Sequence, residues 1–119
     1  MQAFRVCFIA AMLTSASAFA ANVTQAASAE NGKSAFVRHG CWQCHGFEGQ
    51  GSVTTSGGRV IADTQLSLDA FAAYVREPSG AMPPYRAEIL SDSDLADIYA
   101  YLESRPKPTA AKEIPLLSR

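Results

Sequence analysis

Apolar residues recur at helical spacing in two stretches of the chain, and no long stretch alternates apolar and polar residues as strands do. The first stretch follows an N-cap at Ser67 and runs to about Arg76. The second follows Ser91, with an acidic residue three positions on as in a capping box, and ends at Arg105 before a proline. The apolar positions are Leu68, Phe71, Ala72 and Val75 in the first stretch, and Leu95, Ile98, Tyr99 and Leu102 in the second. Each set lies on one face, which predicts two amphipathic helices.

A third helix is predicted over residues 30–40, where Phe36 and Val37 are the bulky apolar residues. Gly32 lies one turn before Phe36, at a position where the absence of a side chain lets a second helix approach closely. Gly40 ends this helix.

Two segments between the predicted helices have the composition of loops. Residues 46–58 contain five glycines among serines and threonines, which predicts an irregular loop whose backbone can approach other groups closely. Residues 80–85 form a rigid turn dominated by two prolines. The pattern therefore predicts an all-α domain of three to four helices with long loops.

The first twenty residues have the form of a secretory signal peptide. A basic start, a short apolar run and an A-x-A site at residues 18–20 are its usual parts. The apolar run is too short to span a membrane, so we expect no transmembrane segment in the mature chain and export to the periplasm. The remaining chain divides into a loose lead-in at residues 21–29, a domain at residues 30–105 and a proline-containing tail at residues 106–119.

Composition narrows the class of protein. The chain has 119 residues, of which 48% are hydrophobic and 18% charged, as expected for one small globular domain. Loss of Arg5 with the signal peptide changes the formal net charge from −1 to about −2. No broad basic patch remains, so nucleic acid is excluded as a partner.

The candidate chemistry lies in the sequence CWQCH at residues 41–45. Cys41 and Cys44, separated by two residues and followed at once by His45, form the pattern of a c-type haem attachment site. Each thiol can add across one haem vinyl group, and His45 is then presented to the iron. We therefore expect one covalent haem c, which would act as the centre of a core that so short a chain cannot otherwise fill.

The two cysteines have three other possible interpretations. A disulfide between Cys41 and Cys44 is the obvious rival in an oxidising compartment, but the adjacent His45 favours haem. A thiol–disulfide oxidoreductase places its CxxC after a strand, whereas the residues before Cys41 have a helical pattern. A zinc site would need a second pair of ligands.

Met82 is the candidate for the sixth ligand of the iron. In electron-transfer haem proteins this ligand is usually methionine or histidine. Met82 is the only methionine left after removal of the signal peptide, and it lies beside the two prolines of the rigid turn. The alternative is an ordinary core methionine. His39, the only other histidine, belongs to the helix before Cys41, and we expect it to be a surface residue.

Taken together, these features resemble the class I c-type cytochromes over about residues 30–105. The resemblance is carried by Gly32-x-x-x-Phe36, by CWQCH followed by Gly46, by Met82-Pro83-Pro84, and by Leu95-Ala96-Asp97-Ile98-x-x-Tyr101-Leu102. It implies a cytochrome c-like fold in which the first and last helices cross. Gly32 and Phe36 would then meet Tyr101 and Leu102.

One departure from the family pattern concerns the loop after the haem motif. Many members have Gly-Pro-x-Leu there, and the proline carbonyl accepts a hydrogen bond from the ligand imidazole. The corresponding run here is Gly57-Gly58-Arg59-Val60, so we expect a carbonyl at Gly57 or Gly58 to take that role. The resemblance also implies that Arg59 pairs with a haem propionate, and a solvated surface arginine is the alternative.

The leading interpretation is an exported monohaem cytochrome that transfers single electrons between redox partners and is not itself an enzyme. The partners would be a dehydrogenase, an oxidase or other cytochromes, and the chain could be the cytochrome subunit or acceptor of a periplasmic dehydrogenase. A second class is a haem enzyme or gas sensor with an open sixth site, which would require Met82 to be off the iron. A thiol–disulfide oxidoreductase is the third class.

Overall fold

The computed structural model describes residues 26–52 and 58–117, and in those ranges the chain is helical and has no strand. The elements in order are α1 (Ala29–Arg38), α2 (Trp42–His45), α3 (Leu68–Arg76), α4 (Asp92–Glu103) and a 3-10 turn at Ala111–Glu113. The predicted all-α fold class is therefore confirmed. The expected signal peptide lies outside the described residues.

Each of the three longer helices begins after a serine that caps it. The serine side-chain oxygen accepts a hydrogen bond from a backbone N–H in the first turn, which stabilises a helix by about 1 kcal/mol. The pairs are Ser28 with Asn31, Ser67 with Ala70, and Ser91 with Asp94. The predicted caps at Ser67 and Ser91 are confirmed, and the first helix begins one residue before its predicted start.

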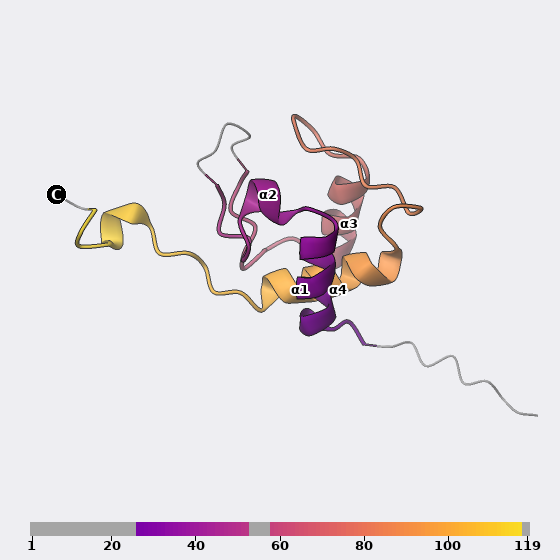
Figure 1. Ribbon diagram of the computed structural model, residues 1–119, viewed down its shortest axis with the longest axis horizontal. Coiled ribbons are helices and arrows are strands. Elements are labelled where there is room, and N and C mark those ends of the chain that lie inside the picture. Colours follow the sequence, from indigo (N-terminus) through magenta and orange to yellow (C-terminus); the bar gives the residue numbers. More distant parts are fainter. Residues whose placement is uncertain (1–25, 53–57, 118–119) are drawn as a thin grey trace, which may run out of the picture.

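Helices α1 and α4 cross in close contact (Figure 1). A Cβ atom on Gly32 would overlap the Asp97 carbonyl group and would lie 2.8 Å from the Cβ atom of Tyr101. One turn further on, the rings of Phe36 and Tyr101 pack with their centroids 5.7 Å apart. Leu102 is buried in the same cluster, so the crossing that the resemblance implied is confirmed.

Polar contacts fasten both ends of this crossing. The Ser28 N–H donates to the Asp97 carboxylate at 2.6 Å. At the other end, the Asp94 carboxylate faces α1, with Arg38 Nη2 at 3.1 Å and His39 Nε2 at 3.5 Å. Partial burial alone would raise the pKa of Asp94, but the hydrogen bonds from Arg38 and His39 outweigh it and lower that pKa.

The expectation of a surface His39 is wrong. Its side chain is only 13% exposed, because α4 lies over the end of α1 and brings the Asp94 carboxylate to the ring. The carbonyl oxygen of His39 is engaged as well, since it accepts a hydrogen bond from the Tyr85 hydroxyl at 3.2 Å. His39 is therefore part of the packing between separate segments of the chain.

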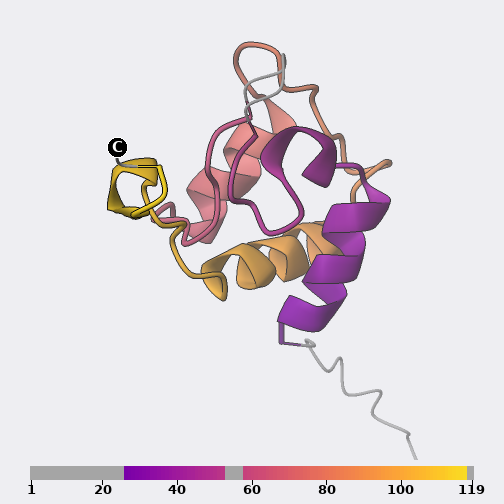
Figure 2. The ribbon, with the colours of Figure 1, turned by 60° about the vertical axis from the view of Figure 1, so that its left-hand side comes forward.

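Helix α3 packs on α4 beyond its first turn. The rings of Phe71 and Tyr99 are 5.5 Å apart, and Val75 is buried, whereas Leu68 at the start of α3 is 39% exposed. In Figure 2 α1, α3 and α4 frame α2 and the loop that follows it. Three helices thus lie around the segment that carries Cys41 and Cys44.

The chain leaves this helical body after α4. Residues 106–117 extend away from it and include the short 3-10 turn (Figure 1). Among the residues described, no helix has both the length and the apolar character needed to cross a membrane.

The close crossing at Gly32 gives a first prediction. Gly32→Ala should lower the free energy of unfolding by about 1–3 kcal/mol, because the new methyl group displaces the Asp97 backbone. This loss should exceed the gain of about 1 kcal/mol that alanine brings to a helix. Denaturant unfolding of the purified holoprotein measures it. Asn31→Ala, at an exposed position of the same helix, is the control and should leave stability unchanged or slightly raised. A Gly32→Ala protein as stable as that control would refute the close approach.

Candidate functional site

A cavity of about 780 Å³ lies between α2, α3, α4 and the two long loops. This volume is within the usual range for cofactor sites, roughly 300–1,000 Å³. Five predicted site residues line it together: Cys41, Cys44, His45, Arg59 and Met82. Much of the remaining wall is apolar, from Phe36, Phe71, Val75, Leu90, Leu95, Ile98 and Leu102. Residues from well-separated parts of the sequence are thus gathered around one apolar space.

The haem motif is placed by a sharp turn at the end of α1. Gly40 has φ +76°, a conformation that favours glycine, and the Cys41 N–H then donates to the Phe36 carbonyl at 3.1 Å. The chain re-enters a helical turn as α2, which sequence reasoning did not predict. The spacing of Cys41 and Cys44 was the available signal, because residues i and i+3 share one helix face. Both cysteines are free thiols and half-buried.

The environment of Cys41 is unlike that of a redox-active thiol. Burial raises the pKa of Cys41 to about 11; a backbone hydrogen bond opposes this shift and the nearby Cys44 adds to it. Catalytic cysteines of oxidoreductases have a lowered pKa instead, so that the thiolate is available as a nucleophile. The neutral thiol of Cys41 therefore counts against the thiol–disulfide oxidoreductase interpretation.

His45 is oriented by the loop that follows it. Its Nδ1 atom lies 2.8 Å from the carbonyl oxygen of Arg59. A carbonyl oxygen can only accept, so Nδ1 carries the proton and Nε2 keeps its lone pair for a metal. The backbone loop thus selects the tautomer that a ligand histidine requires.

The prediction that the carbonyl of Gly57 or Gly58 accepts the hydrogen bond from His45 is wrong, because the acceptor is the Arg59 carbonyl. Gly57 lies outside the described residues, and Gly58 is pressed so closely against Cys44 that a Cβ atom would overlap the Cys44 carbonyl. The Gly58 carbonyl instead accepts a hydrogen bond from the Ser52 N–H at 3.1 Å, and the following residue supplies the carbonyl that reaches the imidazole. The role assigned by resemblance is present, but it lies at Arg59.

The glycines before this point let the loop fold back on itself. The N–H of Gly51 donates to the His45 carbonyl at 2.8 Å, and the Gly49 carbonyl accepts from the N–H groups of Ile61 and Ala62. Gly49 is buried with φ +70°, and a Cβ atom there would lie 2.8 Å from Leu102. The backbone at Gly49 therefore lies so close to the Leu102 side chain that a larger residue would not fit there.

Met82 lies on the same cavity as His45, although the two belong to different segments. Its side chain is half-buried and packs against the core cluster. Tyr85 holds the segment in place: its N–H donates to the Val75 carbonyl at 3.1 Å, and its hydroxyl donates to the His39 carbonyl. Burial raises the pKa of Tyr85, so the hydroxyl stays protonated and remains a donor.

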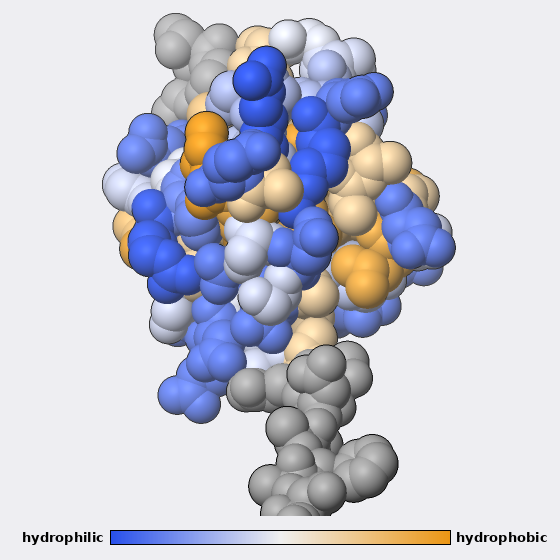
Figure 3. Space-filling view, turned by 90° about the vertical axis from the view of Figure 1, so that its right-hand side faces the viewer, coloured by the Kyte–Doolittle hydropathy of each residue, from blue (hydrophilic) through white to orange (hydrophobic). Residues whose placement is uncertain are grey.

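The residues present fit a haem group. Two thiols, a histidine with a free Nε2 atom and a thioether line one apolar cavity, and these are the attachment and axial groups of His/Met cytochromes. Arg59 also lines the cavity while its side chain is exposed, as suits a partner for a propionate at the rim. On the face drawn in Figure 3, apolar side chains occur only in small patches among polar ones.

Comparison with protein families agrees with this geometry. Residues 27–102, more than half of the chain, match the family model described as cytochrome C oxidase, cbb3-type, subunit III. No curated protein and no solved structure gives a match.

The site predicts that the cofactor cannot be extracted. Two thioether bonds from Cys41 and Cys44 should hold one haem on the mature polypeptide through denaturation and acid extraction. Mass spectrometry of the denatured protein should find the polypeptide plus one haem. Recovery of free haem from the wild-type protein in acid solvent would refute the attachment.

Folding should depend on the same bonds. The helices line a common cavity, and a chain this small gains little stability from burial without a filled centre. Circular dichroism of Cys41→Ala/Cys44→Ala protein should therefore show a substantial loss of helix. The two single variants each keep one attachment point and should fall between the double variant and the wild type. A fully helical, cooperatively unfolding double variant without haem would contradict this dependence.

Proposed function

We propose that this chain, which belongs to the cbb3-type cytochrome c oxidase subunit III family of c-type cytochromes, is an exported carrier of single electrons with His45 and Met82 as the axial ligands. Family membership establishes two parts of this statement: the cofactor is covalently bound haem c with its iron, and the general role is electron transfer. The pair of axial ligands, the export of the chain and its partner proteins are proposed here in addition.

One observation carries the choice of ligands. His45 and Met82 come from separate segments and line one cavity, and the Nδ1 bond to the Arg59 carbonyl leaves Nε2 as the only free ring nitrogen of His45. When bound, haem supplies a one-electron iron couple. A thioether ligand gives that couple a higher potential than a second histidine would.

The remaining residues of the site tune and hold the cofactor. Cys41 and Cys44 attach it to α2, and the buried side chains of α3 and α4 exclude water from it. A low dielectric around the iron disfavours its more charged state, so the same burial also raises the potential. Arg59 is the proposed partner for a propionate, because it is the arginine of the cavity lining.

The proposed setting is the periplasm. The predicted signal peptide at residues 1–20 supports export, and cytochrome c domains are typically exported proteins. The partners would be other redox proteins, and membership of a family of oxidase subunits makes an oxidase complex one of them. A periplasmic dehydrogenase that uses this chain as its cytochrome subunit or acceptor is the other proposed partner.

The test of this proposal is the bond between Met82 and the iron. The ferric wild type should show the weak far-red absorption band of a thioether sulfur on low-spin haem iron. Met82→Ala should abolish the band, lower the reduction potential and open the iron to cyanide or carbon monoxide, because no other methionine remains in the mature chain. Met82→His should keep six ligands and lower the potential.

Pro83→Ala is the matched control, since it changes the same turn and leaves the thioether in place. It should retain the far-red band. Rapid carbon monoxide binding by the reduced wild type would overturn the ligand assignment and favour an open-site haem enzyme or gas sensor.

A further inference from the structure

We propose that Arg76 is a positioning residue for the methionine ligand: its guanidinium group closes the loop that carries Met82 and so keeps the thioether at the iron. This inference rests on the proposed ligation by Met82. It assigns a role to a residue that lies outside the haem cavity and that no sequence motif marks.

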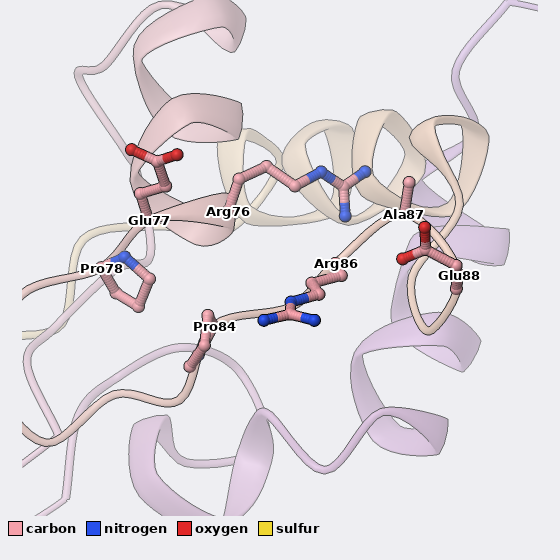
Figure 4. Close-up of a pocket in the computed structure, with 7 residues that line it drawn as sticks. All are labelled: Arg76, Glu77, Pro78, Pro84, Arg86, Ala87 and Glu88. Atoms are coloured by element: carbon pink, nitrogen blue, oxygen red, sulfur yellow. The ribbon is translucent and has the colours of Figure 1, made fainter.

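Arg76 is the last residue of α3, and its side chain is 22% exposed. Nη1 donates to the carbonyl oxygens of Tyr85 and Leu90, both at 2.7 Å, and Nη2 donates to the Asp92 carboxylate at 2.5 Å. Figure 4 shows the extended Arg76 side chain reaching from the end of α3, with Pro84 and Arg86 of the neighbouring segment below it. One side chain thus holds three points between the Met82 turn and the start of α4.

These bonds bear on Met82 through Tyr85, which lies three residues after it. The Tyr85 carbonyl is bound by Arg76, and the Tyr85 N–H is bound by the carbonyl of Val75, the residue before Arg76. Residues 77–84 therefore form a loop whose two ends are fastened to each other. Met82 lies within this loop, so its thioether cannot move far unless the fastening opens.

The three bonds of Arg76 do not contribute equally. The Asp92 carboxylate is 92% exposed, so water screens its ion pair and the net contribution is small. The bonds to Tyr85 and Leu90 join a charged donor to backbone carbonyls, a kind of hydrogen bond stronger than a neutral one. Nη1 reaches both carbonyls while Nη2 reaches Asp92, an arrangement that depends on the fixed fork of arginine and that lysine cannot reproduce.

An arginine that only stabilises the fold would not affect how long Met82 stays on the iron. The rate at which an external ligand replaces Met82 therefore distinguishes a structural role from a positioning role. External imidazole can bind ferric iron only when the methionine leaves, so its binding rate at saturating imidazole reports how often the loop opens. The holoprotein is used throughout, and the far-red sulfur band confirms that each variant starts with Met82 bound.

Arg76→Gln should bind imidazole about tenfold faster than the wild type or more, as expected for the loss of two charge-assisted hydrogen bonds. Arg76→Lys should fall between the two. Arg86→Gln is the matched control, because Arg86 is an exposed arginine that lines the same surface pocket as Arg76, and its removal changes the charge equally (Figure 4). Arg86→Gln and Asp92→Ala should stay within about twofold of the wild-type rate.

Gly32→Ala supplies a destabilised protein whose Met82 loop is intact, and its imidazole rate should equal that of the wild type. Equal imidazole-binding rates for Arg76→Gln and the wild type would overturn the inference. An acceleration by Gly32→Ala as large as that by Arg76→Gln would overturn it too.

If Arg76→Gln does not fold with haem, a wild-type rate in Arg76→Lys overturns the inference. A wild type without the far-red band would instead refute ligation by Met82, which is a failure of the proposed function itself.

Discussion

The helices enclose a large apolar cavity that their own side chains do not fill, and this constraint organises the rest of the structure. α3 and α4 turn buried residues toward a cavity of about 780 Å³, and α1 fixes the position of α4 by crossing it at Gly32. A cavity of this size, lined by side chains that would otherwise pack on one another, is costly unless something occupies it. Haem c, the cofactor of this family, would remove that cost and complete the core, with Cys41 and Cys44 as the proposed attachment points.

The segments around the cavity contain little regular structure, so individual hydrogen bonds hold them. The Arg59 carbonyl accepts from the His45 ring, and the Gly49 carbonyl accepts from two N–H groups across the same loop. On the other loop, Tyr85 is bound through its N–H, its carbonyl and its hydroxyl, and Arg76 supplies the bond to the carbonyl. In each loop the bonds fall close to a residue that lines the cavity, His45 in one and Met82 in the other.

Local patterns were sufficient to predict the three longer helices and the caps at Ser67 and Ser91, because each depends on residues a few positions apart. The errors concern contacts between distant segments. His39 is covered by α4, and the acceptor of the His45 bond is the Arg59 carbonyl, whereas the Gly58 carbonyl is bound by the Ser52 N–H. The His45 bond uses a backbone carbonyl, which every residue possesses, so no residue type in the sequence marks it.

The hydrogen bonds of the two loops also help to distinguish an electron carrier from a haem enzyme or gas sensor. A haem enzyme or gas sensor needs an axial position that opens for a substrate or a gas. Here both segments that carry a proposed ligand are fastened: His45 through its own ring nitrogen, and Met82 through Tyr85 and the end of α3. An electron carrier benefits from such restraint, because ligands that stay bound in both oxidation states leave little to rearrange when the electron moves. The loop closure at Arg76 therefore suits a carrier and would oppose the opening that the other two functions require.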